Sequence, residues 1–515
     1  MLEQRKGISM ESSLLRILWS AMMSLVLLLL LFSPWIRYAC KKEFLNPALL
    51  SILGLSGVLL LLRILRTATI PRFLPLLIGL LFLLLQLYMV RLYFFRTDWD
   101  SGAVTDAAEM LANGIAPSGK LAEYYSNYPN NILITWIYKQ VFRLSIVLGQ
   151  ARPFAFAIIL GIQCLLSFCS GILTFSLCEC VTGDRSLSFL VYILFLLLIG
   201  FSPWVSIPYS DSMGLVFPVL ILRLYTASPS RRWLNGLCCF GVGFFSLIGY
   251  QIKPTILIPL LSALLLFPVR LLRCPDRRRA WRCAALVLAG FFCGLFLFSI
   301  IKADFGFESD PERRLGVAHF LAMGHNEEEM GIWSSEDVQF SESFATAAER
   351  DAADLQLAKA RIREMGPIGL AKHYARKLLT CFQDGTFAWW QEGEFCIKVY
   401  ENNSPAAGFL RNVYYRGGAY YQAFSNFEQT IWLAVLWLAL GSAIAPRRDG
   451  TAVIQLSLLG MMLYCLLFEV RARYLYVFAP LYLVLAASGL CVLRNRFFRN
   501  TPSEAGQRTI ASEGA

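Results

Sequence analysis

Long apolar runs alternate with short polar connections along most of this chain. Many of the runs approach the twenty or so residues that an α-helix needs to cross the roughly 30 Å hydrocarbon core of a bilayer. The runs are 15–36, 47–65, 73–95, 154–176, 187–206, 212–225, 233–250, 254–271, 283–301, 430–444, 452–468 and 474–493. The pattern therefore predicts an all-α polytopic membrane protein with about twelve transmembrane helices.

One further apolar stretch, 131–148, has a different pattern. Thr135, Lys139 and Arg143 recur at i, i+4 and i+8, and apolar residues recur at helical spacing on the opposite side. This pattern is typical of an amphipathic helix that lies in the membrane interface.

Arginine clusters beside the runs orient them, because basic residues concentrate in cytoplasmic loops. The clusters are Arg63, Arg66 and Arg72; Arg231 and Arg232; Arg270, Arg273, Arg277, Arg278, Arg279 and Arg282; Arg447 and Arg448; Arg494 and Arg496. If 131–148 lies flat, every one of these clusters faces the cytoplasm. Both termini are then cytoplasmic, and two long segments, 96–153 and 302–429, lie outside. Arg37, Lys41 and Lys42 are exceptions, because this topology places them outside.

The topology divides the chain into six parts. Residues 1–95 form a three-span region, 96–153 the first extracytoplasmic loop, 154–301 a central bundle and 302–429 a second extracytoplasmic loop. Residues 430–493 form a C-terminal three-span region, and 494–515 a cytoplasmic tail. In the second loop, 343–365 has the pattern of an amphipathic helix ended by Gly366 and Pro367, so this loop is partly helical.

Composition supports a membrane protein and excludes other classes. Hydrophobic residues make up 57% of the chain and charged residues 16%, which differs from soluble, disordered and disulfide-rich secreted proteins. The formal net charge is +12, but the basic residues lie beside apolar runs, and this placement argues against nucleic-acid binding. Cys381 and Cys396 in the second loop either form a disulfide or are free thiols.

Two carboxylates begin the first outer loop, in the sequence Arg96-Thr97-Asp98-Trp99-Asp100. At this position, Asp98 or Asp100 is a candidate general base, with a pKa tuned by partial burial and by the neighbouring like charge. The alternative is a solvated loop with carboxylates at a helix start.

Other charged residues are expected at the same outer face. Asp211 lies between two closely spaced runs, Lys253 precedes Pro254, and Arg471 and Arg473 precede the last run. Charges are costly inside a bilayer, and guanidinium and ammonium groups suit phosphate oxygens. These residues therefore form either a site or a set of snorkelling anchors.

Several short motifs resemble the GT-C superfamily of integral membrane glycosyltransferases, particularly bacterial relatives of glycosyltransferase family 39 and the protein mannosyltransferases. The motifs are Asp98-Trp99-Asp100, Asp106 to Gly114, Tyr128-Pro129-Asn130-Asn131, Tyr209-Ser210-Asp211, Lys253-Pro254-Thr255, Lys377 to Gly385 and Arg471-Ala472-Arg473-Tyr474. The superfamily's first acidic pattern often has adjacent acids, whereas Trp99 separates them here, so the choice of base stays open.

The resemblance implies an enzyme that transfers a sugar from a polyprenyl-phosphate donor to an acceptor of the cell envelope, on the extracytoplasmic side. Asp100 or Asp98 would deprotonate the acceptor, with inversion at the anomeric carbon. Lys253, Arg471 and Arg473 would neutralise the phosphate, and Asp211 would orient the acceptor or a metal. Tyr128, Asn130 and Asn131 are further candidate substrate-binding residues. A divalent cation, Mg²⁺ or Mn²⁺, serves some relatives and not others.

Two alternatives remain at this stage. A secondary transporter or lipid flippase of envelope glycolipids would normally carry charges at mid-membrane. A polysaccharide polymerase or ligase could use the same cations for a pyrophosphate-linked donor.

Overall fold

The computed structural model describes residues 2–65, 68–92, 95–96, 99–227, 229, 231–273, 276–393, 398–399, 402–445 and 450–498. Apart from two short paired strands, the regular structure in these residues is helical. This confirms the all-α class. Eight helices are long and apolar enough to cross a membrane. The twelve-span count stays a prediction.

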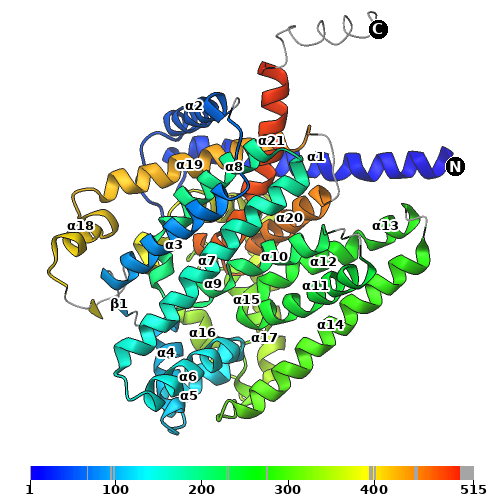
Figure 1. Ribbon diagram of the computed structural model, residues 1–515. Helices are drawn as coiled ribbons and strands as arrows, with labels where there is room; N and C mark the ends of the chain where they lie inside the picture. The colour runs from blue at the N-terminus through cyan, green and yellow to red at the C-terminus, as the bar shows by residue number, and fades with distance from the viewer. Residues whose placement is uncertain are drawn as a thin grey trace, which may run out of the picture.

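The N-terminal region contains three such helices. They are α1 (Leu2–Phe32), α2 (Pro47–Leu65) and α3 (Leu74–Leu92). The 3-10 helix η1 (Ser33–Trp35) directly follows α1. The next segment contains β1 (Phe95–Arg96), α4 (Asp100–Ala112), α5 (Lys120–Asn127), η2 (Pro129–Asn131) and α6 (Ile132–Val147). In Figure 1, α4, α5 and α6 lie together at the lower left, away from both termini.

The central region has four more spanning candidates and several broken helices. Its elements are α7 (Arg152–Thr182), α8 (Arg185–Phe195), the π-helix η3 (Leu196–Gly200), η4 (Pro203–Ser206), α9 (Ser210–Gly214), α10 (Val216–Tyr225), α11 (Arg232–Ile252), η5 (Pro254–Leu257), α12 (Ile258–Leu265), α13 (Phe267–Arg273) and α14 (Arg277–Asp304). The predicted run 187–206 corresponds to α8 with η3 and η4, and the run 212–225 to α9 with α10. Each is therefore interrupted and shorter than a regular span.

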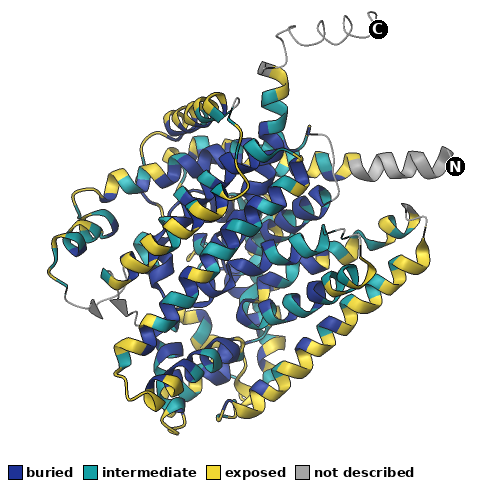
Figure 2. Ribbon diagram, viewed as in Figure 1, coloured by how far each residue is buried: buried dark blue, intermediate teal, exposed yellow. Residues whose placement is uncertain are grey.

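The remaining elements are η6 (Pro311–Arg313), α15 (Val317–Gly324), α16 (Ser335–Glu342), α17 (Ala347–Phe382), η7 (Trp389–Gly393), β2 (Lys398–Val399), α18 (Pro405–Tyr414), α19 (Tyr421–Gly441), α20 (Thr451–Leu467), η8 (Ala472–Phe478) and α21 (Ala479–Phe498). Strand β2 pairs antiparallel with β1. The segment from η8 to α21 contains the eighth spanning candidate, and 89% of its most apolar stretch is buried. It is therefore the most buried of the eight spanning candidates, and Figure 2 shows buried residues along its lower part.

The helix predicted at 343–365 begins later than expected. Thr346 caps α17, because its side chain accepts a bond from the Glu349 backbone N–H and its own backbone N–H donates one to the Glu349 side chain. This capping box fixes the first helical residue at Ala347, so the predicted start at 343 was wrong. The predicted break is present as a kink, with Gly366 at φ 60°.

The polar stripe on α6 faces protein. Thr135 and Lys139 are buried, and Lys139 forms an ion pair with Asp304 at the end of α14, with Nζ 3.6 Å from Oδ2. Val147 and Leu148, at the far end of α6, are exposed. The helix therefore turns part of its polar side inward and exposes apolar side chains.

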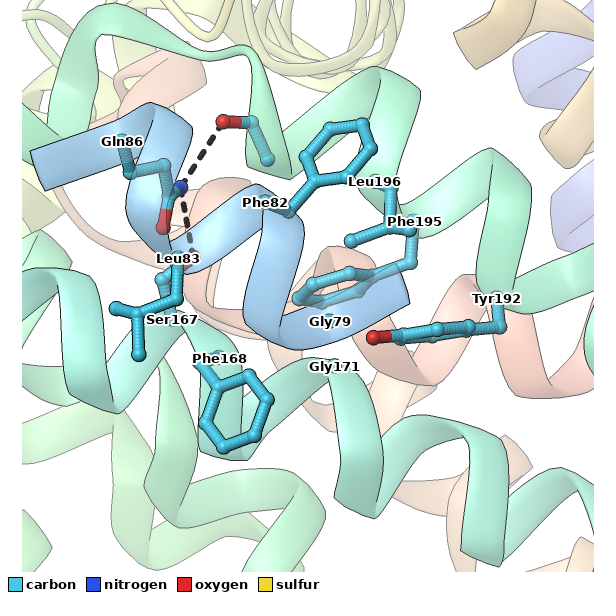
Figure 3. A pocket seen from close by; sticks show the side chains of 11 residues that line it. Gly79, Phe82, Leu83, Gln86, Ser167, Phe168, Gly171, Tyr192, Phe195 and Leu196 are labelled. Carbon is cyan, nitrogen blue, oxygen red and sulfur yellow. Dashed lines mark hydrogen bonds between the residues drawn. The ribbon is translucent and has the colours of Figure 1, made fainter. Parts of the chain in front are cut away.

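A polar contact lies in the apolar packing of α3 against α7 and α8. Gln86 on α3 donates hydrogen bonds to Ser167 Oγ at 3.2 Å and to the carbonyl of Gly200 at 2.9 Å. Figure 3 shows this side chain beside the aromatic residues that line the helix junction. Because Gly200 ends the π-helix η3, the bond satisfies a carbonyl where the regular helix ladder is interrupted.

Glycine allows α11 and α14 to approach closely. A Cβ atom at Gly243 would lie 1.8 Å from the carbonyl oxygen of Val287, and one at Gly290 would lie 2.0 Å from that of Phe240. Small residues at such crossings are typical of helix pairs in membranes.

We expect Gly290→Ala to lower the free energy of unfolding by about 1–3 kcal/mol, because the added methyl group forces the two helices apart. Gly57→Ala is the matched control, since nothing lies within 4 Å of a Cβ at that position. The control should be neutral or slightly stabilising, because alanine favours a helix. Unfolding by detergent titration measures both, and equal stability of the two variants would contradict the packing.

Candidate functional site

Charged side chains from distant segments meet at one end of the bundle. Asp100 begins α4, Asp211 lies in α9, Lys253 separates α11 from η5, and Arg471 and Arg473 lie at the start of η8. Two further acids join them: Glu392 of η7 and Glu469, which follows α20. We call these seven residues the ionic cluster.

Local breaks in the helices bring these side chains together. Tyr209, Lys253 and Arg471 each have an extended backbone and each precedes a new helix. Pro254 follows Lys253, and proline disfavours a helical conformation at the residue before it. The chain thus leaves one helix, extends for a few residues and starts another at the site.

Arg473 and Lys253 hold the centre of the cluster. Lys253 Nζ donates to Asp211 Oδ1, and Arg473 Nη1 lies 3.6 Å from the other oxygen of Asp211. Arg473 Nε lies 2.6 Å from Glu392 Oε2, and its Nη2 lies 4.0 Å from Asp100 Oδ2. One guanidinium therefore faces three carboxylates that come from distant parts of the sequence.

Arg471 forms a second centre. Its Nε lies 3.7 Å from Glu392 and 3.7 Å from Glu469. Burial raises the pKa of Glu469, although Arg471 and Arg473 oppose the rise. Glu392 thus links the two arginines.

The cluster is mostly buried, and Asp100 has its most exposed side chain. Asp211 is 1% exposed and Lys253 7%, whereas the side chain of Asp100 is 38% exposed. Tyr209 donates its hydroxyl to Asp100 Oδ2 at 3.0 Å. Asp100 therefore lies where a buried ionic network meets the outside, which suits a group that exchanges a proton with a substrate.

Aromatic side chains surround Asp100. The ring of Trp99 meets that of Tyr209 edge to face, with centroids 5.0 Å apart, and the Arg473 guanidinium lies 4.9 Å from the Trp99 centroid. Burial raises the pKa of Tyr124 and of Tyr128, and the negative charge of Asp100 adds to both shifts. These tyrosines stay neutral and act as hydrogen-bond partners at ordinary pH.

Helices begin at the cluster. Asp100 is the first residue of α4, and Asp211 is the second residue of α9. Lys253 and Arg471 immediately precede η5 and η8, which lead into α12 and α21. The N-terminal end of a helix carries a partial positive charge and unpaired N–H groups. Their convergence makes this a place where an added anion is stabilised.

The structure brings Asp100, Asp211, Lys253, Arg471 and Arg473 into one cluster; their role in a site stays a prediction. Asp98 lies outside the described residues, and so does Cys396. Asn131 donates to the Tyr124 hydroxyl at 2.6 Å, which connects it to the aromatic residues around Asp100. Asn130 is exposed and is 3.5 Å from Asn131.

Sequence reasoning missed Glu392 as a site residue. It lies in an aromatic-rich stretch of segment 302–429 that has no helical or charge pattern in the sequence. Glu469 belongs to the motif Glu469-Val470-Arg471-Ala472-Arg473. Because an acid and two arginines alternate in this motif, the sequence could have predicted an ion pair here.

Segment 302–429 contacts the residues that precede Arg471. Val470 N donates to the carbonyl of Gly331 at 2.9 Å. Lys377, buried in α17, donates to the carbonyls of Gly324 at 2.6 Å and Phe468 at 2.7 Å. Residues 468–470 are therefore held in place by contacts with this segment.

Lys377 should make this docking depend on pH. Burial lowers its pKa from 10.5 to about 7, so between these values the unfolded chain binds a proton that the folded chain does not. Stability should therefore rise with pH over this window, by up to about 1.4 kcal/mol per pH unit. Thermal unfolding of Lys377→Met should lack this rise, and parallel pH profiles for the variant and the wild type would contradict the assignment.

The described residues do not fit a divalent metal. No three His, Cys, Asp or Glu side chains among them come close enough to hold one, and the carboxylates of the cluster face arginine and lysine.

A family model described as a conserved hypothetical integral membrane protein matches residues 8–490. The chain belongs to this family. It is a multi-pass membrane protein, which agrees with the eight apolar helices. Comparisons with curated proteins and with solved structures gave no match.

Proposed function

We propose that this protein is a membrane glycosyltransferase that takes a sugar from a polyprenyl-phosphate donor and passes it to an acceptor hydroxyl on the extracytoplasmic side. The observation that carries the proposal is the ionic cluster, with one accessible carboxylate beside buried cations at the start of several helices. The motifs that resemble GT-C glycosyltransferases supply the donor class.

In this mechanism Asp100 is the general base. It removes the proton of the acceptor hydroxyl, whose oxygen then attacks the anomeric carbon from the face opposite the phosphate. The bond from that carbon to the phosphate oxygen breaks, and polyprenyl phosphate leaves with the electron pair. The configuration at the anomeric carbon is inverted.

The cations and helix ends stabilise the leaving phosphate. The Arg473 Nε and Nη1 atoms are buried without a well-aligned hydrogen-bond acceptor, although carboxylates lie near both. A phosphate oxygen offers a better acceptor, and bonds between guanidinium and phosphate are strong. Developing charge on the leaving group is therefore stabilised in the transition state, as catalysis requires.

The lipid donor explains why the site lies at one end of an apolar bundle. The membrane delivers the polyprenyl chain, so the protein needs only to receive the phosphate and the sugar. Exposed apolar side chains on α14, including Phe292 and Phe296, and on α2 and α3 provide lipid-facing surface (Figure 2).

The test uses purified protein in detergent with a radiolabelled polyprenyl-phosphate sugar. The proposal predicts that free polyprenyl phosphate accumulates with time, faster when a mixture of envelope acceptors is added. An intact donor after prolonged incubation with active, folded protein and acceptor would contradict it.

A transporter of envelope glycolipids is the second candidate, because the cluster lies among discontinuous helices. η4 with α9, η5 with α12 and η8 with α21 each interrupt a regular helix near the charges, and such breaks are typical of secondary transporters. A transporter would move the labelled lipid between leaflets of a proteoliposome without splitting it. The glycosyltransferase would release polyprenyl phosphate in detergent, where no leaflets exist.

A further inference from the structure

A polar cleft separates the first outer segment from the second. It has a volume of about 420 Å³ and lies between α5, the η6 turn and the junction of α16 with α17. Its charged and amide side chains are Glu123, Asn127, Asp310, Arg313, Glu342 and Arg350. In Figure 1, α5 and α16 lie near the same lower edge of the molecule. A cleft of this size is within the range of small-molecule sites.

Buried polar residues fix the walls of the cleft. Arg350 is 2% exposed and donates to the carbonyls of Ser341, Glu312, Arg314 and Phe344 at 2.7–3.1 Å. Asn127 is 7% exposed and donates to Glu342 Oε1 at 2.6 Å. The walls are thus held in place before any ligand binds, which lowers the entropic cost of binding.

The polarity of the cleft argues against the lipid part of the donor. Its lining has three carboxylates and two guanidinium groups, which make it too polar for a polyprenyl chain. Carboxylates accept hydrogen bonds, whereas guanidinium and amide N–H groups donate them. Arg350 is already bonded to four carbonyl oxygens, so the hydroxyl groups of a ligand would accept from Arg313 and donate to the carboxylates.

Helix α5 connects the cleft with Asp100. Glu123 and Asn127 line the cleft, whereas Tyr124, on the same helix, interacts with Asp100. Tyr128 follows α5, and its ring centroid lies 5.3 Å from that of Tyr124. Tyr128 therefore lies next to the tyrosine that interacts with Asp100.

We propose that this cleft binds the acceptor, and that the acceptor is a saccharide chain whose terminal hydroxyl reaches Asp100 past Tyr128. The identification of this ligand as an acceptor rests on the proposed function. The cleft itself, and its preference for a hydroxyl-rich ligand, do not depend on it.

The experiment measures binding of three probes, the linear trisaccharides of glucose, mannose and N-acetylglucosamine, by saturation-transfer difference NMR on the purified full chain. At least one trisaccharide should bind the wild type. Ser343→Trp fills the cleft, and Glu342→Gln removes a charge while keeping an oxygen that accepts the Asn127 bond. Each should weaken binding about ten-fold or more. For Ser343→Trp the indole ring occupies the space of the ligand, and for Glu342→Gln the lost hydrogen bond to a charged group contributes about 1.5–3 kcal/mol.

Glu336→Gln is the matched control, because Glu336 is exposed on the same helix as Glu342 and does not line the cleft. It should bind like the wild type. Failure of all three trisaccharides to bind the wild type would overturn the proposal, as would equal binding by Ser343→Trp and the wild type.

A parallel assay separates this inference from the proposed function. Release of polyprenyl phosphate to water needs no acceptor, so Ser343→Trp should retain it while losing trisaccharide binding. If the wild type releases no polyprenyl phosphate but its trisaccharide binding is lost in Ser343→Trp, the cleft assignment holds and the glycosyltransferase proposal fails.

Discussion

Asp100→Asn should lower the rate of sugar transfer by about 10²–10⁴, while the protein still folds and inserts. A positioned general base typically contributes this much, and asparagine keeps the shape of the side chain without accepting the proton. The partial exposure of Asp100 and its hydrogen bond from Tyr209 place the carboxylate for this role. Initial rates of polyprenyl phosphate release with acceptor present measure the effect.

Asp106→Asn is the control for that variant. Asp106 lies on the same helix and pairs with Arg152 at 3.0 Å, outside the ionic cluster. Its replacement should leave the transfer rate within a few-fold of the wild type. Full activity of Asp100→Asn would move the role to Asp98 or remove it from this motif.

Lys253→Met should lower the free energy of unfolding by about 3–5 kcal/mol, because it leaves Asp211 buried without its closest cation. Asp211 is 1% exposed, and the remaining cation, Arg473, lies 3.6 Å from its Oδ2 atom without forming a hydrogen bond to it, so Arg473 compensates only part of the loss. Reversible unfolding in mixed micelles with increasing SDS measures the change.

The double variant Lys253→Met with Asp211→Asn tests whether the buried charge of Asp211 causes this loss of stability. Removing that charge should recover much of the lost stability, whereas a loss of lysine packing alone would not be reversed. Lys302→Met, at an exposed position on α14, should change stability by no more than about 0.5 kcal/mol. A Lys253→Met protein as stable as the wild type would contradict a buried ion pair.

Much of the fold follows from hydrophobic periodicity, because spanning helices depend on local composition. The runs at 47–65 and 73–95 correspond closely to α2 and α3. The runs at 187–206 and 212–225 look equally apolar, yet they contain breaks after Gly200 and at Leu215. Tertiary contacts such as the bond from Gln86 to Gly200 decide where these breaks lie, and such contacts are not visible in local sequence.

The site was partly predictable for a similar reason. Charged residues next to apolar runs, such as Lys253 and Arg473, are conspicuous in sequence because a bilayer penalises them. Glu392 lies in a loop where an acid is common, and only the fold shows that it lies 2.6 Å from Arg473. The polar stripe of α6 is visible in the sequence as a helical repeat. The partner of Lys139 in this stripe, Asp304, is 165 residues away in sequence and becomes apparent only in the fold.

The most direct test of the central claim is where a lipid phosphate binds. A photoreactive polyprenyl phosphate, with its reactive group beside the phosphate, would be cross-linked to the protein in nanodiscs and mapped by mass spectrometry. The account predicts adducts at Trp99, Tyr209 and Tyr474, beside the ionic cluster. Adducts confined to the arginine-rich connection around Arg277 to Arg282, with none near the cluster, would contradict it.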